Sequence, residues 1–244
     1  DIECSFYDEE KIMQLSESLM RKIFKDLIDD KISLDFPRIS YKDSMYKYGC
    51  DKPDLRNPLC LVEISEILKN TKFKVFKDCV GNSNSRIVAL NVPGGNSISR
   101  KNIDVYTELV KSFGAKGLAY FKLDNIDDVP SGVNSPISKF LSDKEISDII
   151  KSVDSKSGDL IFFSADNSEI VNSSMSALIM QLGKDLKLLS DDYKFAWIID
   201  YPMFEYEKNS KKLTSLHHPF TSPVNLNSEH FDDSTLSRAY DLTL

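Results

Sequence analysis

Apolar side chains recur every three or four positions over residues 8–27, and this spacing predicts an amphipathic helix. Its expected apolar face consists of Ile12, Leu15, Leu19, Ile23 and Leu27. Asp8 is expected to cap this helix, because a carboxylate accepts hydrogen bonds from the free N–H groups of the first turn. Glu9 and Glu10 follow, where negative charge suits the positive end of the helix dipole. An acidic, capped helix is therefore the first predicted element.

Short strands and helices are predicted along the rest of the chain. Apolar runs predict strands at residues 72–75, 86–92, 117–123, 159–165 and 195–204, the last interrupted at Pro202. Helices are expected after Ser99, after the capping box of Ser142 and Glu145, and over residues 168–182, ending at Gly183. The polar, turn-rich residues 41–58 are expected to form a linker or a binding loop.

The mixture of elements decides the fold class. Strands and helices follow one another without the strict period of a doubly wound fold, so the predicted class is α+β. The length of 244 residues suffices for one or two domains. The chain opens with Asp1 instead of Met and stops in a strand-like run, so we expect it to be a piece of a longer protein.

Composition excludes several classes of protein. Hydrophobic residues make up 41% and charged residues 28%, which excludes a fibrous, collagen-like or wholly disordered chain. The net charge is −7, so any contact with nucleic acid would need a local basic patch. Candidate patches are Lys69, Lys72, Lys74 and Lys77, or Arg100 with Lys101; the alternative is a solvated face. No run approaches the roughly 18 apolar residues of a membrane helix, so no membrane partner is expected.

The four cysteines, Cys4, Cys50, Cys60 and Cys79, show no CxxC spacing. This spacing favours free thiols in a reducing compartment, which predicts a cytoplasmic protein, and argues against a zinc site. No metal-ligating residues are predicted.

Three short segments carry residues suited to chemistry. Asp1 and Glu3 share one face of an extended segment, and paired carboxylates can hold an ammonium group or a metal; the alternative is two solvated acids at a chain end. In residues 49–58, Lys52 and Arg56 are candidate phosphate donors. The alternative is a structural loop with local salt bridges.

The third segment contains two adjacent histidines, His217 and His218. On an extended segment they point to opposite faces, so they are not expected to bind one metal ion together. One can face a cleft and bind a carboxylate, because an imidazole donates hydrogen bonds and carries charge near neutral pH. His230 is expected at the surface. The sequence contains neither GxxxxGK[ST] nor GxGxxG, so any use of ATP does not involve a P-loop.

Read in order, several strings resemble those of the bacterial-type aspartyl-tRNA synthetases of class II. They are DIE followed by SF, FPRI, YGCDKPDLRNP, VPGG, GAKGLA, GDLIFF, PMFE, HHPFTSP and AYDL. The strings DKPDLRNP and HHPFTSP are the specific ones. Cys50 stands where the family usually has Ser, and Ser164-Ala165-Asp166 stands where Gly-Ala-Asp is common.

The resemblance implies an internal fragment of such an enzyme. Residues 1–60 and 190–244 would belong to the antiparallel-sheet catalytic domain, beginning at the tail of the second class II motif. Residues 61–189 would form the inserted mixed α+β domain, the GAD domain. The arginine of the second motif, the acidic magnesium ligands and the third motif would be missing, so the fragment alone is expected to be inactive and to bind no cofactor.

For the full-length enzyme, the resemblance implies activation of L-aspartate by ATP with Mg²⁺, followed by transfer to tRNA-Asp, with tRNA-Asn left open. It also implies a homodimer. His217, and His218 second, would bind the side-chain carboxylate of aspartate, Asp1 its ammonium group, and Glu3 the ammonium group or the nucleotide. The alternative function is a non-catalytic module, built on the inserted domain, that binds tRNA or a partner protein.

Overall fold

The computed structural model describes residues 2–28, 35–207, 212–228 and 230–244, which form two compact units. The first unit takes its described residues from 1–44, 51–56 and 190–244, and the second comprises 45–50 and 57–189. The boundaries expected near residues 60 and 190 lie close to the ends of the second unit. Their assignment to a catalytic domain and an insert stays a prediction.

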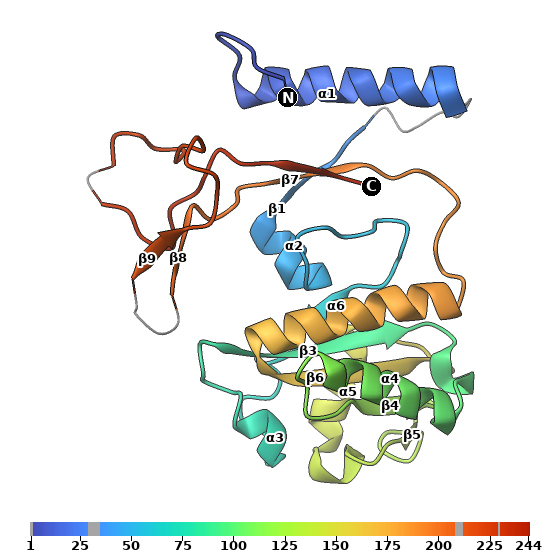
Figure 1. Cartoon of the computed structure of the whole chain (residues 1–244). Coiled ribbons are helices and arrows are strands. Elements are labelled where there is room, and N and C mark those ends of the chain that lie inside the picture. The colour runs from blue at the N-terminus through green and yellow to red at the C-terminus, as the bar shows by residue number, and fades with distance from the viewer. Residues whose placement is uncertain (1, 29–34, 208–211, 229) are drawn as a thin grey trace. The chain divides into compact units, whose positions relative to one another are not determined.

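The first unit contains a long helix and a small mixed sheet (Figure 1). Helix α1 (Glu9–Ile23) continues into one π-helical turn (Phe24–Ile28). Strand β7 (Ala196–Ile199) is central in the sheet, parallel to β1 (Arg38–Ser40) and antiparallel to β10 (Asp241–Thr243). Strands β8 (Phe204–Tyr206) and β9 (Leu213–Ser215) form a separate antiparallel pair. Helix α2 (Tyr41–Tyr48) follows β1, where the sequence predicts only a loop, so that prediction is wrong.

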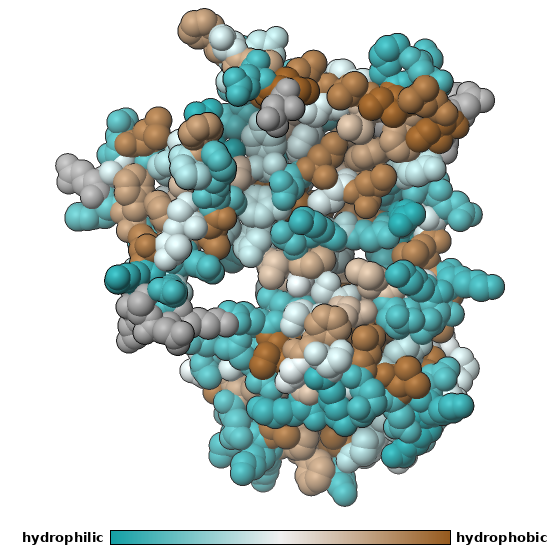
Figure 2. All heavy atoms as spheres, viewed as in Figure 1, coloured by the Kyte–Doolittle hydropathy of each residue, from teal (hydrophilic) through white to brown (hydrophobic). Residues whose placement is uncertain are grey.

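Helix α1 is capped as predicted, but only part of its predicted apolar face is covered, because Ile23 packs against the cluster of Met13 and Phe24 while the leucines do not. Asp8 accepts a hydrogen bond from the Lys11 backbone N–H at 2.9 Å. Side chains expected in the core are exposed: Leu15 by 44%, Leu19 by 45% and Leu27 by 79%. Figure 2 shows apolar side chains along α1 at the surface.

The reason is that the helix turns polar side chains toward aromatic rings. Glu17 accepts a hydrogen bond from Trp197 Nε1 at 3.0 Å, and the Arg21 guanidinium lies 4.9 Å from the centre of the Phe36 ring. These contacts bring Met13 and Phe24, not the leucines, into a cluster with Phe36, Phe195 and Trp197. Apolar spacing alone does not record such polar–aromatic pairs.

The second unit is built on a five-stranded antiparallel sheet of order β2-β3-β6-β4-β5. The strands are β2 (Leu61–Glu63), β3 (Ser85–Val92), β4 (Ala119–Leu123), β5 (Val133–Asn134) and β6 (Leu160–Asn167). Alternate side chains divide between two cores, as the pleat of a strand requires. Leu160 and Phe162 join one cluster, and Ile161 and Phe163 join the other.

Helices cover both faces of this sheet. Side chains of α4 (Arg100–Ser112) and α6 (Ser168–Asp185) pack into the cluster that contains Phe162. Side chains of α3 (Lys74–Lys77) and α5 (Asp143–Ser152) pack into the cluster that contains Phe163. Two short 3-10 turns, Gly95–Ser97 and Ser138–Phe140, complete the elements of the unit. The mixed composition and the antiparallel sheet agree with the predicted α+β class.

Most of the elements predicted in this unit are confirmed. Strands lie within the predicted ranges 86–92, 117–123 and 159–165, give or take one or two residues at the ends. Ser99 caps α4, and Ser142 with Glu145 forms the capping box of α5. The strand predicted at residues 72–75 is wrong, because α3 begins at Lys74 and buries Phe76 while Val75 is 50% exposed.

A buried arginine joins several parts of this unit. Arg86 is 8% exposed and donates to Glu63 Oε2 at 3.0 Å and to Asn172 Oδ1 at 2.7 Å. The nitrogen that binds Asn172, Nη1, also donates to Met45 O at 3.2 Å, and Nη2 donates to Tyr46 O at 2.9 Å. These bonds tie residues 45–50 to the sheet of the second unit.

The sequence predicts that Gly183 ends the last helix. This prediction is wrong, because Gly183 lies inside α6 (Ser168–Asp185). A Cβ atom at this position would lie 2.4 Å from Asn57 Nδ2. That amide donates to the carbonyl oxygen of Ile179 at 2.8 Å, and Asn57 is buried. The glycine is therefore required by the close approach of Asn57 to the helix.

We expect Gly183→Ala to destabilise the second unit by about 1–3 kcal/mol, because the displaced Asn57 amide leaves buried polar groups unpaired. Elsewhere in a helix the same change stabilises by up to about 1 kcal/mol. Urea unfolding followed by backbone amide exchange measures the effect. Gly117→Ala is the control, since a Cβ at Gly117 meets no atom within 4 Å. Unchanged or increased stability of Gly183→Ala would contradict this explanation.

No helix in the described part of the chain combines the length and the apolar character needed to cross a bilayer.

Candidate functional site

The paired histidines of the first unit lie on a segment that backbone hydrogen bonds hold on both sides. The Leu216 N–H donates to Met203 O at 3.1 Å, and the Arg238 N–H donates to Ser222 O at 2.9 Å. Ser237 closes the arrangement, because its N–H donates to Tyr201 O at 2.8 Å. Residues 217–223 thus connect residues 201–203 with residues 235–239.

His217 is half-buried and has a fixed ring orientation. Its Nε2 lies 2.9 Å from Pro202 O and 3.3 Å from Ser237 Oγ. Because a carbonyl oxygen can only accept, we assign the proton to Nε2. The Tyr201 ring packs edge-on against the imidazole at 5.8 Å. The remaining ring nitrogen, Nδ1, can then donate to a ligand only when the imidazole carries a second proton.

His218 is exposed and has different surroundings. Its Nδ1 accepts the Phe220 N–H at 3.2 Å, and its ring lies edge-on to the Phe220 ring at 4.8 Å. This leaves Nε2 as its outward donor. The two neighbouring imidazoles therefore offer opposite ring nitrogens: backbone groups engage Nε2 of His217 and Nδ1 of His218.

Tyr201 forms the wall behind His217. It is 7% exposed, and its hydroxyl donates to Asp241 Oδ2 at 3.1 Å. Burial, followed by the Asp241 charge, raises the pKa of the Tyr201 hydroxyl far above its ordinary value. The phenol is therefore a neutral donor that fixes the ring next to His217.

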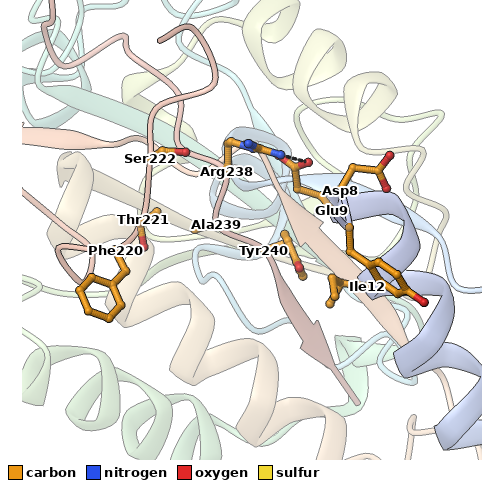
Figure 3. Close-up of a pocket in the computed structure, with 10 residues that line it drawn as sticks. Asp8, Glu9, Ile12, Phe220, Thr221, Ser222, Arg238, Ala239 and Tyr240 are labelled. Carbon is orange, nitrogen blue, oxygen red and sulfur yellow. Dashed lines mark hydrogen bonds and ion pairs between the residues drawn. The ribbon is translucent and has the colours of Figure 1, made fainter. Parts of the chain in front are cut away.

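A cavity of about 450 Å³ lies beside this segment (Figure 3). Its polar centre is an ion pair in which Glu9 accepts from Arg238 Nε and, at 2.5 Å, from Arg238 Nη2. The hydrogen bonds from Arg238 lower the pKa of the Glu9 carboxyl. Phe220, Thr221 and Ser222 from the histidine segment also line the cavity. The arginine beside the site is thus neutralised by a carboxylate of α1.

The roles predicted for the two acids, Asp1 and Glu3, stay predictions. Asp1 lies outside the described residues. Glu3 is exposed and forms no hydrogen bond or ion pair within the part of the chain that the structure describes. Residues that the sequence analysis missed are Glu9, Arg238, Ser237 and Tyr201. Among these four, only Glu9 is indicated by a local sequence pattern, and that pattern relates it to the helix dipole and not to the site.

In the polar loop of residues 49–58, Arg56 forms a local salt bridge, as the structural interpretation of this loop expects, while the role of Lys52 stays a prediction. Arg56 binds Asp54 through two nitrogens, at 2.9 and 2.8 Å, and this pairing lowers the pKa of Asp54. Its guanidinium is therefore already occupied by a carboxylate. In the candidate basic patch, Lys69 pairs with Glu66 at 2.5 Å. All four cysteines are free, and His230 is exposed, as predicted.

Comparison with known proteins links both units to one family. Residues 76–175 match the GAD domain. The whole chain is 43% identical over 247 aligned residues to proteins named aspartate--tRNA(Asp/Asn) ligase from Legionella pneumophila strains Corby and Paris. The resemblance to the aspartyl-tRNA synthetases is confirmed. The match covers 100% of this chain but only 42% of the length of each ligase. The chain thus aligns with part of these ligases, and the match to the GAD domain lies within its second unit.

We expect Glu9→Gln to destabilise the first unit by about 0.5–1 kcal/mol at pH 7, since the pair is partly exposed. The folded pKa of Glu9 is lowered, so its contribution is present above the unfolded pKa and disappears as the pH falls through the folded one. Urea unfolding followed by fluorescence of Trp197, the single tryptophan, reports this unit. The difference from the wild type should vanish in acid. A difference that persists below both pKa values would exclude the ion pair as its source.

Proposed function

We propose that the chain is part of a class II ligase that attaches L-aspartate to tRNA-Asp. The observation that carries this proposal is the identity of 43% along the whole chain to ligases named for this reaction. In that reaction the aspartate α-carboxylate attacks the α-phosphorus of ATP and pyrophosphate leaves. The 3′-terminal adenosine of the tRNA then attacks the aspartyl-adenylate. The relatives' names include tRNA-Asn, which we propose as a second acceptor to be tested.

We propose that the first unit supplies segments of the catalytic domain and that the second unit is the inserted domain. The full-length ligase would act as a homodimer in the cytoplasm, where translation takes place. Mg²⁺ would assist the attack on ATP by neutralising phosphate charge. Among the described residues no group of three or more His, Cys, Asp or Glu side chains could hold a metal ion. We therefore assign no step of this chain to Mg²⁺.

His217 is our first candidate for the side-chain carboxylate of aspartate. Its Nε2–H is engaged by Pro202 O, so the protonated ring would offer Nδ1–H to the carboxylate. A charged donor of this kind favours aspartate over asparagine, whose amide carries no negative charge and directs N–H groups at the site. His218, through Nε2, is the second candidate. Asp1 is proposed for the ammonium group, and Glu3 for the ammonium group or the nucleotide.

We expect His217→Ala in the full-length ligase to raise the KM for aspartate about tenfold or more, the size expected for a lost hydrogen bond to a charged group. ATP–pyrophosphate exchange at varied aspartate concentration measures this effect. His230→Ala, which removes an exposed imidazole elsewhere in the same unit, is the matched control. An unchanged aspartate affinity in pre-steady-state binding would remove His217 from this role.

We expect residues 1–244 alone to show no aspartate-dependent ATP–pyrophosphate exchange, while the full-length protein charges tRNA-Asp. The physical reason is that rate enhancement here depends on positioning and on neutralising phosphate charge, and the chain aligns with only 42% of the length of the ligases that carry out this reaction. Aminoacylation with tRNA-Asp and tRNA-Asn in parallel tests both acceptors. A full-length protein that charges neither would overturn the proposed function.

A further inference from the structure

The second unit contains a cavity of about 600 Å³ that the proposed ligase reaction does not use. It lies where β4 and β6 separate. Strand β4 pairs with β6 only from Ala119, opposite Phe163, whereas β6 continues to Asn167. On this side, no strand of the described chain pairs with the last residues of β6.

The unpaired stretch of β6 is an available strand edge. Neighbouring residues of a strand direct their N–H and C=O groups to opposite sides. On β3, Ile87 O faces β2, because it accepts the Ile64 N–H at 2.9 Å. The backbone groups of the next residue, Val88, therefore face β6, where they form hydrogen bonds with those of its partner Ser164. Ala165, the next residue of β6, therefore turns its backbone groups toward the open edge. Such an edge is a template for an added strand.

The cavity floor next to this edge is apolar. Phe76 and Phe163 are nearly fully buried and their ring centres lie 6.2 Å apart, and Phe73 and Ile137 are among the other apolar residues that line the cavity. Gly117 adds no side chain to the rim, and a Cβ there would meet no heavy atom within 4 Å. The rim of the cavity therefore has open space at Gly117. The volume of the cavity lies in the range of ligand-binding pockets.

Asp166, which follows Ala165 on β6, has a buried carboxylate oxygen. Asp166 is 14% exposed at its side chain, and no described residue donates a hydrogen bond to its buried Oδ2. Lys116 Nζ lies 3.1 Å from this oxygen as an ion pair without hydrogen-bond geometry, and its own side chain is 86% exposed. Buried polar atoms are nearly always hydrogen-bonded, so Asp166 is suited to a cation supplied by a ligand in place of the exposed Lys116.

These three features define one kind of occupant. Ala165 packs with the Phe163 cluster, so strand alternation places Asp166 on the opposite face. A strand added at this edge would turn one side chain into the apolar cavity and its neighbour toward Asp166. We propose that this edge binds an extended peptide segment of a partner protein in which an apolar residue is followed by Lys or Arg.

A peptide titration tests the proposal on the isotope-labelled chain. The probe is acetyl-Thr-Phe-Lys-Thr-amide, and the control peptide carries Glu in place of Lys. We expect saturable shifts of the Ala165 and Gly117 amide signals with the Lys peptide, and affinity at least about tenfold weaker with the Glu peptide. Phenethylamine, which has the ring and the ammonium group but no backbone amide, should bind at least about tenfold more weakly than the Lys peptide.

Variants of the chain separate the contribution of the apolar cavity from that of the Asp166 carboxylate. Gly117→Leu fills open space and should weaken binding at least about tenfold, whereas Gly117→Ala should retain it. Asp166→Asn should remove the preference for Lys over Glu. No saturable shift up to about 10 mM peptide, equal binding of both peptides, or phenethylamine binding as tightly as the peptide would each overturn the proposal. None of these results depends on ligase activity, so the proposed function is tested separately.

Discussion

An ion pair between Glu9 and Arg238 connects the first turn of α1 to the segment that precedes β10. Arg238 directly follows Ser237, whose hydroxyl touches His217 and whose N–H binds Tyr201. A carboxylate near one end of the chain thus fixes the backbone that positions an imidazole near the other end. The pair also removes the free charge of an arginine beside a site proposed for a doubly acidic substrate. Electrostatics and backbone geometry at the histidine segment therefore depend on the same contact.

Local patterns predict most elements of the second unit. The strands that form β3, β4 and β6 show apolar runs, and Ser142 with Glu145 forms its capping box within four residues. One prediction fails where a residue far away in the sequence determines the identity of a helix position. Gly183 is glycine because Asn57, far away in the sequence, approaches the helix.

The candidate site could be predicted only in part. His217 and His218 stand in a recognisable string, but they lie beyond the end of β9 at Ser215, so strand alternation does not determine their differing surroundings. The ring nitrogen that His217 keeps free depends on Pro202 O, which no local pattern specifies. Glu9 and Arg238 are 229 positions apart, so their pairing becomes visible only in the folded chain. The buried side of α1 was misjudged for a similar reason, since Trp197 selects Glu17 from the opposite end of the sequence.

The first unit is assembled from three separate stretches, while all but six residues of the second come from one continuous stretch, 57–189. Strand β7, which is central in the sheet of the first unit, follows that whole stretch in the chain and must then pair with β1. Closing so long a loop costs conformational entropy before any contact compensates for it. During synthesis the second unit can complete its own core first, since domains generally fold as units in the order in which they emerge. The late arrival of β7 then makes assembly of the histidine segment one of the last events in folding.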